Sequence, residues 1–230
     1  MTRESCGSNY SVEESYEKIT EIEKNIQIQM RTLANDHSIN NWKKLFALFR
    51  ERDEMVIAIP DFWFNVIQCE EKILRHFSDD DFEILNSFDD LQLSFIPDEM
   101  IIKVEFKFRS NPYFDNHVIC RKYSLKKNRL RLSTLTPIKW KDGHEPAKNE
   151  GDKEAIKPNP TLVFFDWLSS LNQFDQMAHW IIFKMYPNAF KMFSRIENSE
   201  NQRAETSSIA SDAQNSTFEQ TPCDTITEQA

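Results

Sequence analysis

The stretch from Ser11 to Ile59 contains neither glycine nor proline, and Pro60 ends it. Because helices commonly end just before a proline, a single helix over 11–59 is the simplest structure for this stretch. At about 1.5 Å per residue such a helix would be about 70 Å long, several times the length of an average helix. Its centre, Asn35–Asn41, is polar and rich in weak helix formers, so a break at this point is the alternative.

Apolar residues recur along this stretch in steps of three and four, which is the spacing of a coiled-coil seam. No other apolar-periodic segment of the chain is comparably long, so a second copy of the same helix is the simplest partner, and we predict a homodimer. The predicted dimerisation residues are Ile19, Ile26, Leu33, Leu45, Leu48 and Val56. The alternative is that the helix folds back on its own chain.

The remainder of the folded region changes from helical to strand periodicity and back. Ser78 followed by three aspartates is a strong helix start, since a hydroxyl cap and early carboxylates both suit a helix N-terminus. Further helices are predicted at Phe62–Phe77, Thr161–Ser169 and Gln173–Phe193. Strict alternation of apolar and charged residues indicates half-buried strands. These are predicted at Leu91–Ile96, Ile102–Phe108, His117–Leu125 and Leu130–Trp140.

These elements predict an α+β fold, in which a long N-terminal dimerisation helix precedes a four-stranded antiparallel sheet packed on helices. The predicted organisation is a disordered N-terminus over 1–10, the helix over 11–59, an α/β domain over 60–196 and a disordered tail over 197–230. The tail has seven acidic residues and one arginine among many Ser, Thr, Gln and Asn residues, a composition too polar to build a core.

The residue types argue against an enzyme. Only three glycines are present, so the glycine-rich turns of P-loops, dinucleotide-binding folds and nucleophile elbows are absent. The five histidines are far apart and the four cysteines form no CxxC pair, so no metal-ligand spacing is found. We predict no catalytic residue, no cofactor, no metal and no small-molecule substrate. The cysteine pattern, and the lack of an apolar signal segment or membrane span, predict a soluble intracellular protein.

The formal charge of −9 is unevenly distributed. Residues 70–99 contain ten acids and two bases, whereas residues 103–141 contain eleven bases and two acids. The isoelectric point of about 5.2 is far below that of a dedicated nucleic-acid-binding domain. A basic partner therefore suits this chain at least as well as a nucleic acid.

Six short motifs, each weak alone, occur in one order along the chain. They are IPDFW (Ile59–Trp63), NPYF (Asn111–Phe114), the strand His117–Leu125, PIKW (Pro137–Trp140), FFDW (Phe164–Trp167) and YPN (Tyr186–Asn188). Together they resemble the nucleosome assembly protein family, and more closely its SET and testis-specific Y-protein branch. The resemblance covers about residues 16–193.

The resemblance implies a dimeric histone chaperone that binds core histones on the helical side of its sheet, acts in chromatin and is located in the nucleus, with the cytoplasm as a second compartment. By similarity, the segment around FFDW and the next helix contributes Asp166, Ser169, Asp175 and Gln176 to histone binding. The same side is expected to include Asp79, Asp80 and Asp81, because histone lysines and arginines require acidic acceptors.

Two features depart from the family pattern. The C-terminal tail is diluted by Ser, Thr and Gln rather than densely acidic, and the helix after FFDW is unusually apolar over His179–Phe183. These departures favour an alternative function, a dimeric chromatin or signalling adaptor that regulates transcription or a phosphatase without depending on histones.

Overall fold

The computed structural model describes residues 12–69, 74, 77–126, 129–145, 162–171 and 175–198. By their contacts, residues up to Phe193 form one compact unit, and the chain from Ser194 forms a second. Four parts of the chain lie largely or partly outside the described residues: the predicted N-terminal segment 1–10, residues 146–161, part of the predicted helix Phe62–Phe77 and nearly all of the tail 197–230. Within the described part, no helix combines the length and apolar character needed to cross a membrane.

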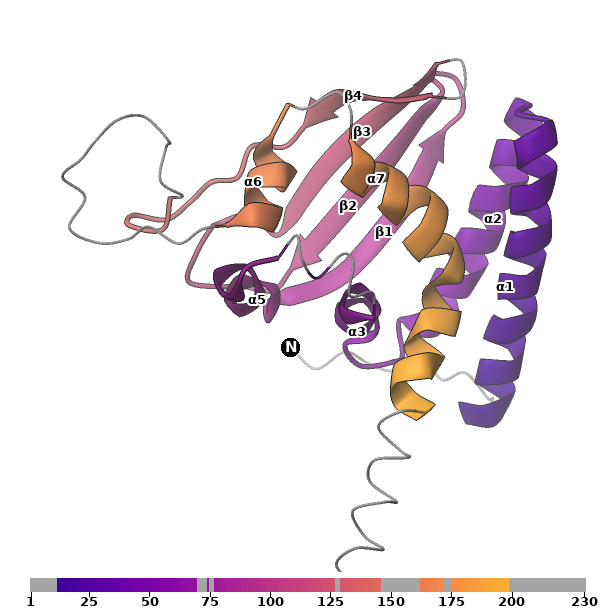
Figure 1. Cartoon of the computed structure of the whole chain (residues 1–230), viewed down its shortest axis with the longest axis horizontal. Helices are drawn as coiled ribbons and strands as arrows, with labels where there is room; N and C mark the ends of the chain where they lie inside the picture. The colour runs from indigo at the N-terminus through magenta and orange to yellow at the C-terminus, as the bar shows by residue number, and fades with distance from the viewer. Residues whose placement is uncertain are drawn as a thin grey trace, which may run out of the picture. The chain divides into compact units, whose positions relative to one another are not determined.

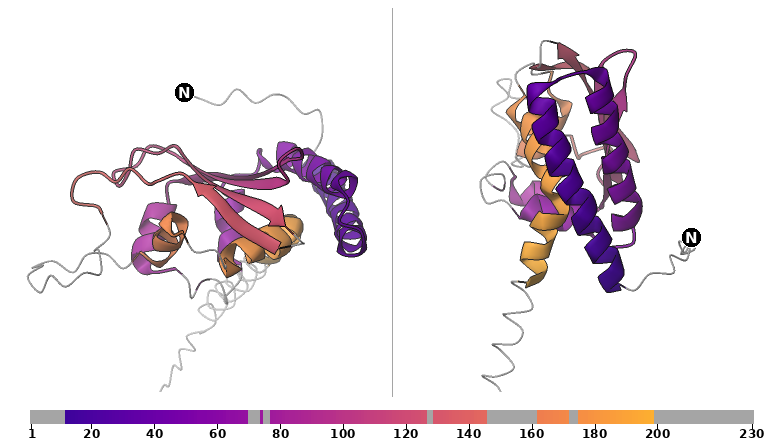
Figure 2. Two further views of the ribbon diagram at one scale, coloured as in Figure 1. Left: turned by 90° about the horizontal axis from the view of Figure 1, so that it is seen from above. Right: turned by 90° about the vertical axis from the view of Figure 1, so that its right-hand side faces the viewer.

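The N-terminal stretch forms two helices, α1 (Val12–Asn35) and α2 (Ile39–Val56), which lie side by side (Figures 1 and 2). The prediction of one continuous helix is therefore wrong at its polar centre. Asp36 accepts hydrogen bonds from the Ser38 amide at 3.0 Å and from Asn41 Nδ2 at 2.8 Å. Ser38 in turn caps α2 by accepting from the Asn41 amide at 3.4 Å. These short-range bonds satisfy the backbone and side chains of a tight turn, which replaces the continuous helix.

The predicted dimer seam is covered by the chain itself. Its residues Ile19, Ile26, Leu33, Leu45 and Val56 are buried within the single chain, and Leu48 is half-buried. The fold-back alternative is the arrangement that the structure adopts. A hairpin and a paired long helix bury the same apolar positions, so hydrophobic spacing alone does not distinguish them.

The four strands form one antiparallel sheet in the order β1-β2-β3-β4, as the α+β prediction requires. The strands are β1 (Phe88–Ile96), β2 (Ile101–Phe108), β3 (Val118–Lys126) and β4 (Arg129–Leu135). β4 ends before the predicted Trp140, because Pro137 cannot donate to a strand ladder and Trp140 makes only an isolated bridge to Phe114. Alternate residues of β2 are buried, so one face of the sheet meets the core.

Short helices cover that inner face, as Figure 2 shows from above. They are α3 (Phe62–Gln68), α5 (Asp79–Leu85), α6 (Val163–Ser169) and α7 (Gln176–Trp180). After α7 the chain continues through a π-helical turn, η1 (Ile181–Met185), and a 3₁₀ turn, η2 (Tyr186–Asn188), into residues 189–193. The aromatic rings of the FFDW motif pack beneath β2, where Phe106 lies 5.8 Å from Phe164 and 6.0 Å from Trp167 between ring centroids.

The YPN motif interrupts the hydrogen bonding of this last helix, and the hairpin supplies the missing partners. Pro187 has no amide hydrogen and disfavours a regular helix around it. Gln27 Nε2 donates to the Pro187 carbonyl at 2.7 Å. Glu23 accepts from the amides of Phe190 at 2.7 Å and Lys191 at 2.9 Å. Burial raises the pKa of Glu23, an effect that these amide donors and Arg52 oppose. Glu23 is thus buried, and Gln27 half-buried, where their side chains bond to the irregular helix.

Candidate functional site

The surface beneath the sheet is organised by Arg121, which lies on β3 and is fully buried. Its Nη1 donates to three backbone carbonyls near the end of α6, those of Trp167 at 2.9 Å, Leu168 at 2.8 Å and Ser170 at 3.1 Å. Its Nη2 forms an ion pair with Asp175 at 2.8 Å. One guanidinium therefore attaches the end of α6 and the start of α7 to the inner face of the sheet.

Asp175 is the N-cap of α7 and accepts several further hydrogen bonds. Its donors are the Tyr123 hydroxyl at 2.6 Å, Trp167 Nε1 at 2.7 Å and the Ala178 amide at 2.8 Å. The side chain is only 2% exposed. Burial, reinforced by the Asp175 carboxylate, raises the pKa of Tyr123 well above its usual range. The prediction of Asp175 as a histone contact is therefore wrong, because its oxygens are already used inside the fold.

Asp81 is also internal. It completes a capping box with Ser78 at the start of α5. Its carboxylate also accepts from the amides of Val163 at 2.9 Å, Phe164 at 3.0 Å and Phe165 at 3.3 Å, at the start of α6. The side chain has no exposed surface, so its prediction as a histone contact is wrong. A hydroxyl followed three residues later by a carboxylate is the capping-box pattern, which is the sequence signal for this role.

The other predicted residues are accessible. Asp79, Asp166, Ser169 and Gln176 are exposed, and Asp80 is half-buried. Because Asp81 contacts the starts of both α5 and α6, the structure brings the acidic first turn of α5 close to the start of α6, where Asp166 lies. Partial burial, with the nearby Asp81 carboxylate, raises the pKa of Asp166. We call Asp79, Asp80 and Asp166 the acidic cluster.

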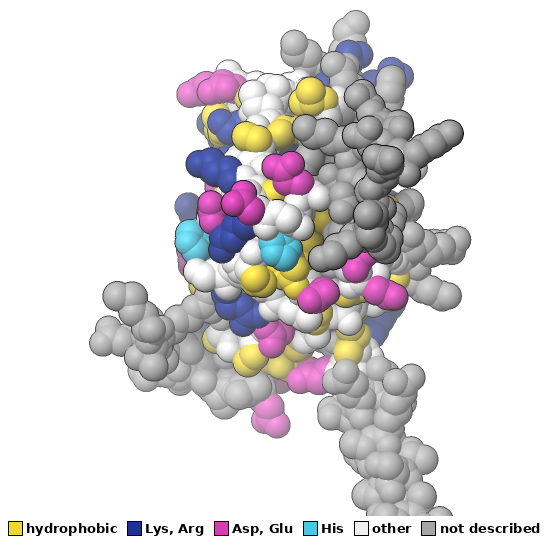
Figure 3. Space-filling model, turned by 90° about the vertical axis from the view of Figure 1, so that its left-hand side faces the viewer, with side chains coloured by type: hydrophobic (Ala, Val, Ile, Leu, Met, Phe, Trp, Pro, Cys, Tyr) yellow, Lys and Arg dark blue, Asp and Glu magenta, His cyan; other side chains and the backbone are white. Residues whose placement is uncertain are grey.

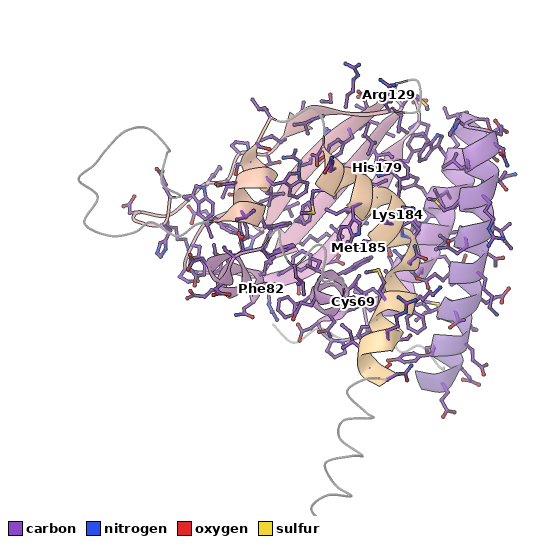
Figure 4. The ribbon with its side chains drawn as sticks, viewed as in Figure 1. Cys69, Phe82, Arg129, His179, Lys184 and Met185 are labelled. Atoms are coloured by element: carbon purple, nitrogen blue, oxygen red, sulfur yellow. The ribbon has the colours of Figure 1, made fainter. Side chains whose placement is uncertain are left out.

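Apolar groups accompany these polar residues. Leu171 is 77% exposed just after α6, and Val163 is 39% exposed at the start of that helix. The exposed His179 ring of α7, labelled in Figure 4, lies 4.8 Å between centroids from the half-buried ring of Phe183 in η1. The side of the molecule in Figure 3 has acidic and basic side chains interspersed with hydrophobic ones. A partner that binds at the acidic cluster would therefore also meet exposed apolar side chains at the two ends of α6.

The structure provides no sign of an enclosed catalytic or metal site among its described residues. None of their His, Cys, Asp and Glu side chains gather in a group of three or more that could hold a metal ion. A groove of about 560 Å³ lies between α2 and β1, lined by residues that include Phe46, Asp53 and Phe95. None of the predicted site residues lines this groove.

A family model and several known proteins are similar in sequence to this chain. The model of the nucleosome assembly protein (NAP) family matches residues 9–164, more than half of the chain. Protein SET of Drosophila melanogaster is 25% identical over 211 residues, which cover 84% of this chain and 77% of that protein. Human testis-specific Y-encoded protein 3 is 28% identical over 155 residues, covering 65% of this chain and 48% of its own length. The chain thus spans about half the length of this human relative.

Solved structures show the same fold at low sequence identity. The nucleosome assembly protein 1 of Plasmodium knowlesi aligns with a TM-score of 0.53 and 20% identity, covering 81% of this chain and 98% of that one. The Vps75 histone chaperone aligns with a TM-score of 0.52 and 15% identity, covering 82% of this chain and 100% of that one.

Proposed function

Because the chain belongs to the nucleosome assembly protein family, we propose that it is a histone chaperone that binds core histones beneath its sheet. The observation that carries the proposal is the family match over 9–164, which extends from the hairpin through the sheet to the start of α6. The proposed contacts are the acidic cluster together with Ser169 and Gln176. Binding would act by charge and shape complementarity, without catalysis or cofactor, on chromatin components in the nucleus and additionally in the cytoplasm.

The test reverses two charges of the acidic cluster, Asp79→Lys with Asp166→Lys. Exposed ion pairs each contribute up to about 1 kcal/mol, so the double variant should lose about 1–2 kcal/mol of binding free energy, roughly a 5- to 30-fold rise in Kd for purified core histones. Fluorescence anisotropy of labelled histones measures the effect. Asp98→Lys with Glu99→Lys is the matched control, since these exposed acids lie in the β1–β2 turn and give the same net charge change. Equal losses in both variants would contradict the proposed contacts.

A second candidate, the chromatin or signalling adaptor, is favoured by one observation. Asp81 and Asp175 are buried and hydrogen-bonded inside the fold, so fewer acidic side chains than predicted are available to bind histones. A folded chain that fails to bind core histones but captures a non-histone chromatin protein would support this function.

We further propose that the chain forms a homodimer by exchanging α1. Two closed hairpins cannot meet through the predicted seam, because five of its six residues are buried in each chain and Leu48 is half-buried. If the turn at Asp36–Ser38 straightens, α1 can pack on α2 of a second copy and restore the same contacts. The absence of glycine and proline from 11–59 permits this straightening, and short hinges favour such exchange.

At about 10 μM the wild-type protein should sediment as a dimer, because the fraction of dimer depends on the protein concentration. Inserting Gly-Ser-Gly-Ser between His37 and Ser38 relaxes the turn, so this variant should sediment as a monomer. The same insertion between Asp98 and Glu99, in another exposed turn, should leave the dimer intact. A monomeric wild type would refute the exchange.

A further inference from the structure

The outer face of the sheet, opposite the helices, has a basic corner that the proposed function leaves without a role. Alternation places Lys103, Glu105 and Lys107 of β2 on this face, since Ile102, Val104 and Phe106 face the core. By register, Lys103 lies opposite Lys122 on β3, and Ser124 lies opposite Arg131 on β4. The outer face therefore becomes more basic from β1 toward β4.

Local acids neutralise only part of this charge. Lys103 pairs with Glu105 at 2.9 Å, and Lys107 pairs with Asp90 at 3.0 Å. Lys122, Arg129 and Arg131 make no ion pair with any acid in the part of the chain that the structure describes. We call these three residues the hairpin patch. Lys122 also lies opposite Lys103, and like charges directly opposite on neighbouring strands repel one another; Glu105 pairs with Lys103 and not with Lys122.

The accessibility of the patch suits contact with a large partner. Arg129 and Arg131 are exposed, and Lys122 is half-buried. Figure 4 shows Arg129 at the β3–β4 end of the sheet, away from α5 and α3. The groove described above lies along β1, at the opposite edge of the sheet, and none of the patch residues lines it.

We propose that the hairpin patch binds the phosphate backbone of duplex DNA. Arginine guanidinium groups bind phosphate oxygens through two parallel hydrogen bonds, and the exposed hydroxyls of Ser133 and Thr134 on β4 can donate further ones. The described residues of β4 include no aromatic side chain on which an unpaired base could stack, which favours a duplex over a single strand.

The overall negative charge does not prevent this contact. At physiological salt the Debye length is about 8 Å, so exposed acids farther away than this are largely screened. A chain that binds histones beneath the sheet and DNA on its outer face would hold the histones and the DNA on opposite faces. The DNA contact does not depend on the histone proposal, because the two surfaces share no residue.

The test measures binding of the full chain to a labelled 20-base-pair duplex by fluorescence anisotropy, in a salt series from about 50 to 200 mM. Three phosphate contacts predict a slope of about −2.7 in log K against log salt. The variant Lys122→Gln, Arg129→Gln, Arg131→Gln should bind at least about tenfold more weakly at low salt, with a slope near zero. Thermal unfolding of both proteins checks that the variant remains folded.

The matched control is Lys43→Gln, Lys44→Gln, Arg50→Gln, which removes three exposed cations from α2 and changes the net charge equally. It should bind the duplex like the wild type. Equal losses in the two triple variants, or a wild-type slope near zero, would overturn the proposal, as would tighter binding to single-stranded DNA. Histone binding measured on the hairpin-patch variant should be unchanged, so a failure of DNA binding is distinguishable from a failure of the histone proposal.

Discussion

Replacing Arg121 with alanine should lower the free energy of unfolding by about 3–5 kcal/mol, which is the usual effect of removing one partner of a buried ion pair. The substitution leaves the Asp175 carboxylate buried without its cation and three carbonyls near the end of α6 without their donor. Both effects weaken the attachment of α6 and α7, the helices that present Asp166 and Gln176. Denaturant unfolding measures the change from the midpoint and slope.

Arg131→Ala on the neighbouring strand is the matched control, because Arg131 is exposed and most exposed substitutions change stability by less than about 0.5 kcal/mol. The double variant Arg121→Met with Asp175→Asn should recover part of the loss, since it removes both buried charges together. A loss below about 1 kcal/mol for Arg121→Ala would show that Arg121 is not required to hold these helices.

Replacing Arg52 with alanine should have an effect of similar size, about 3–4 kcal/mol, at the other end of the molecule. The Arg52 side chain on α2 is fully buried, pairs with Asp53 at 2.7 Å and donates to the Tyr186 carbonyl in the YPN motif. Its guanidinium also lies 4.5 Å from the ring centroid of Tyr186 and 5.2 Å from that of Trp63. Arg52→Lys should restore little, because a single ammonium cannot replace a planar group with several donors.

The loss of stability in Arg52→Ala should depend on pH through Asp53. Burial raises the pKa of Asp53, while Arg52 and the Tyr186 hydroxyl oppose that rise. Without Arg52 the pKa of Asp53 in the folded state should rise further above its unfolded value. A raised carboxyl pKa favours folding at low pH and is unfavourable above the folded pKa, so the deficit of Arg52→Ala should shrink as the pH falls below neutral toward that folded pKa. Arg50→Ala, exposed on the same helix, should show neither effect.

The sheet could be predicted because strict alternation of apolar and polar residues indicates a half-buried strand, and in β2 the apolar residues do face the core. The hairpin could not be distinguished from a continuous helix, because both bury the same positions. The local hydrogen bonds of Asp36 and Ser38 favour the turn within one chain. Hydrophobic spacing records which residues are buried, but it does not record which chain buries them.

The buried role of Asp81 could be predicted from the sequence, whereas that of Asp175 could not. Asp81 stands three residues after Ser78, and the capping-box pattern indicates that its oxygens are occupied by backbone amides. Arg121 shares the inward alternation of Ile119 and Tyr123 on β3, which indicates a buried cation in need of an acid. Nothing in the sequence identifies Asp175 as that acid, because the pairing depends on how α7 is placed beneath the sheet.

We propose that this chain binds core histones through its own surface, and equilibrium binding of purified core histones to the full chain at about 150 and 500 mM salt tests this most directly. We expect saturable binding at the lower salt concentration that weakens markedly at the higher one, since exposed acids supply part of the attraction. Absence of saturable binding at the lower salt by a folded chain would contradict it.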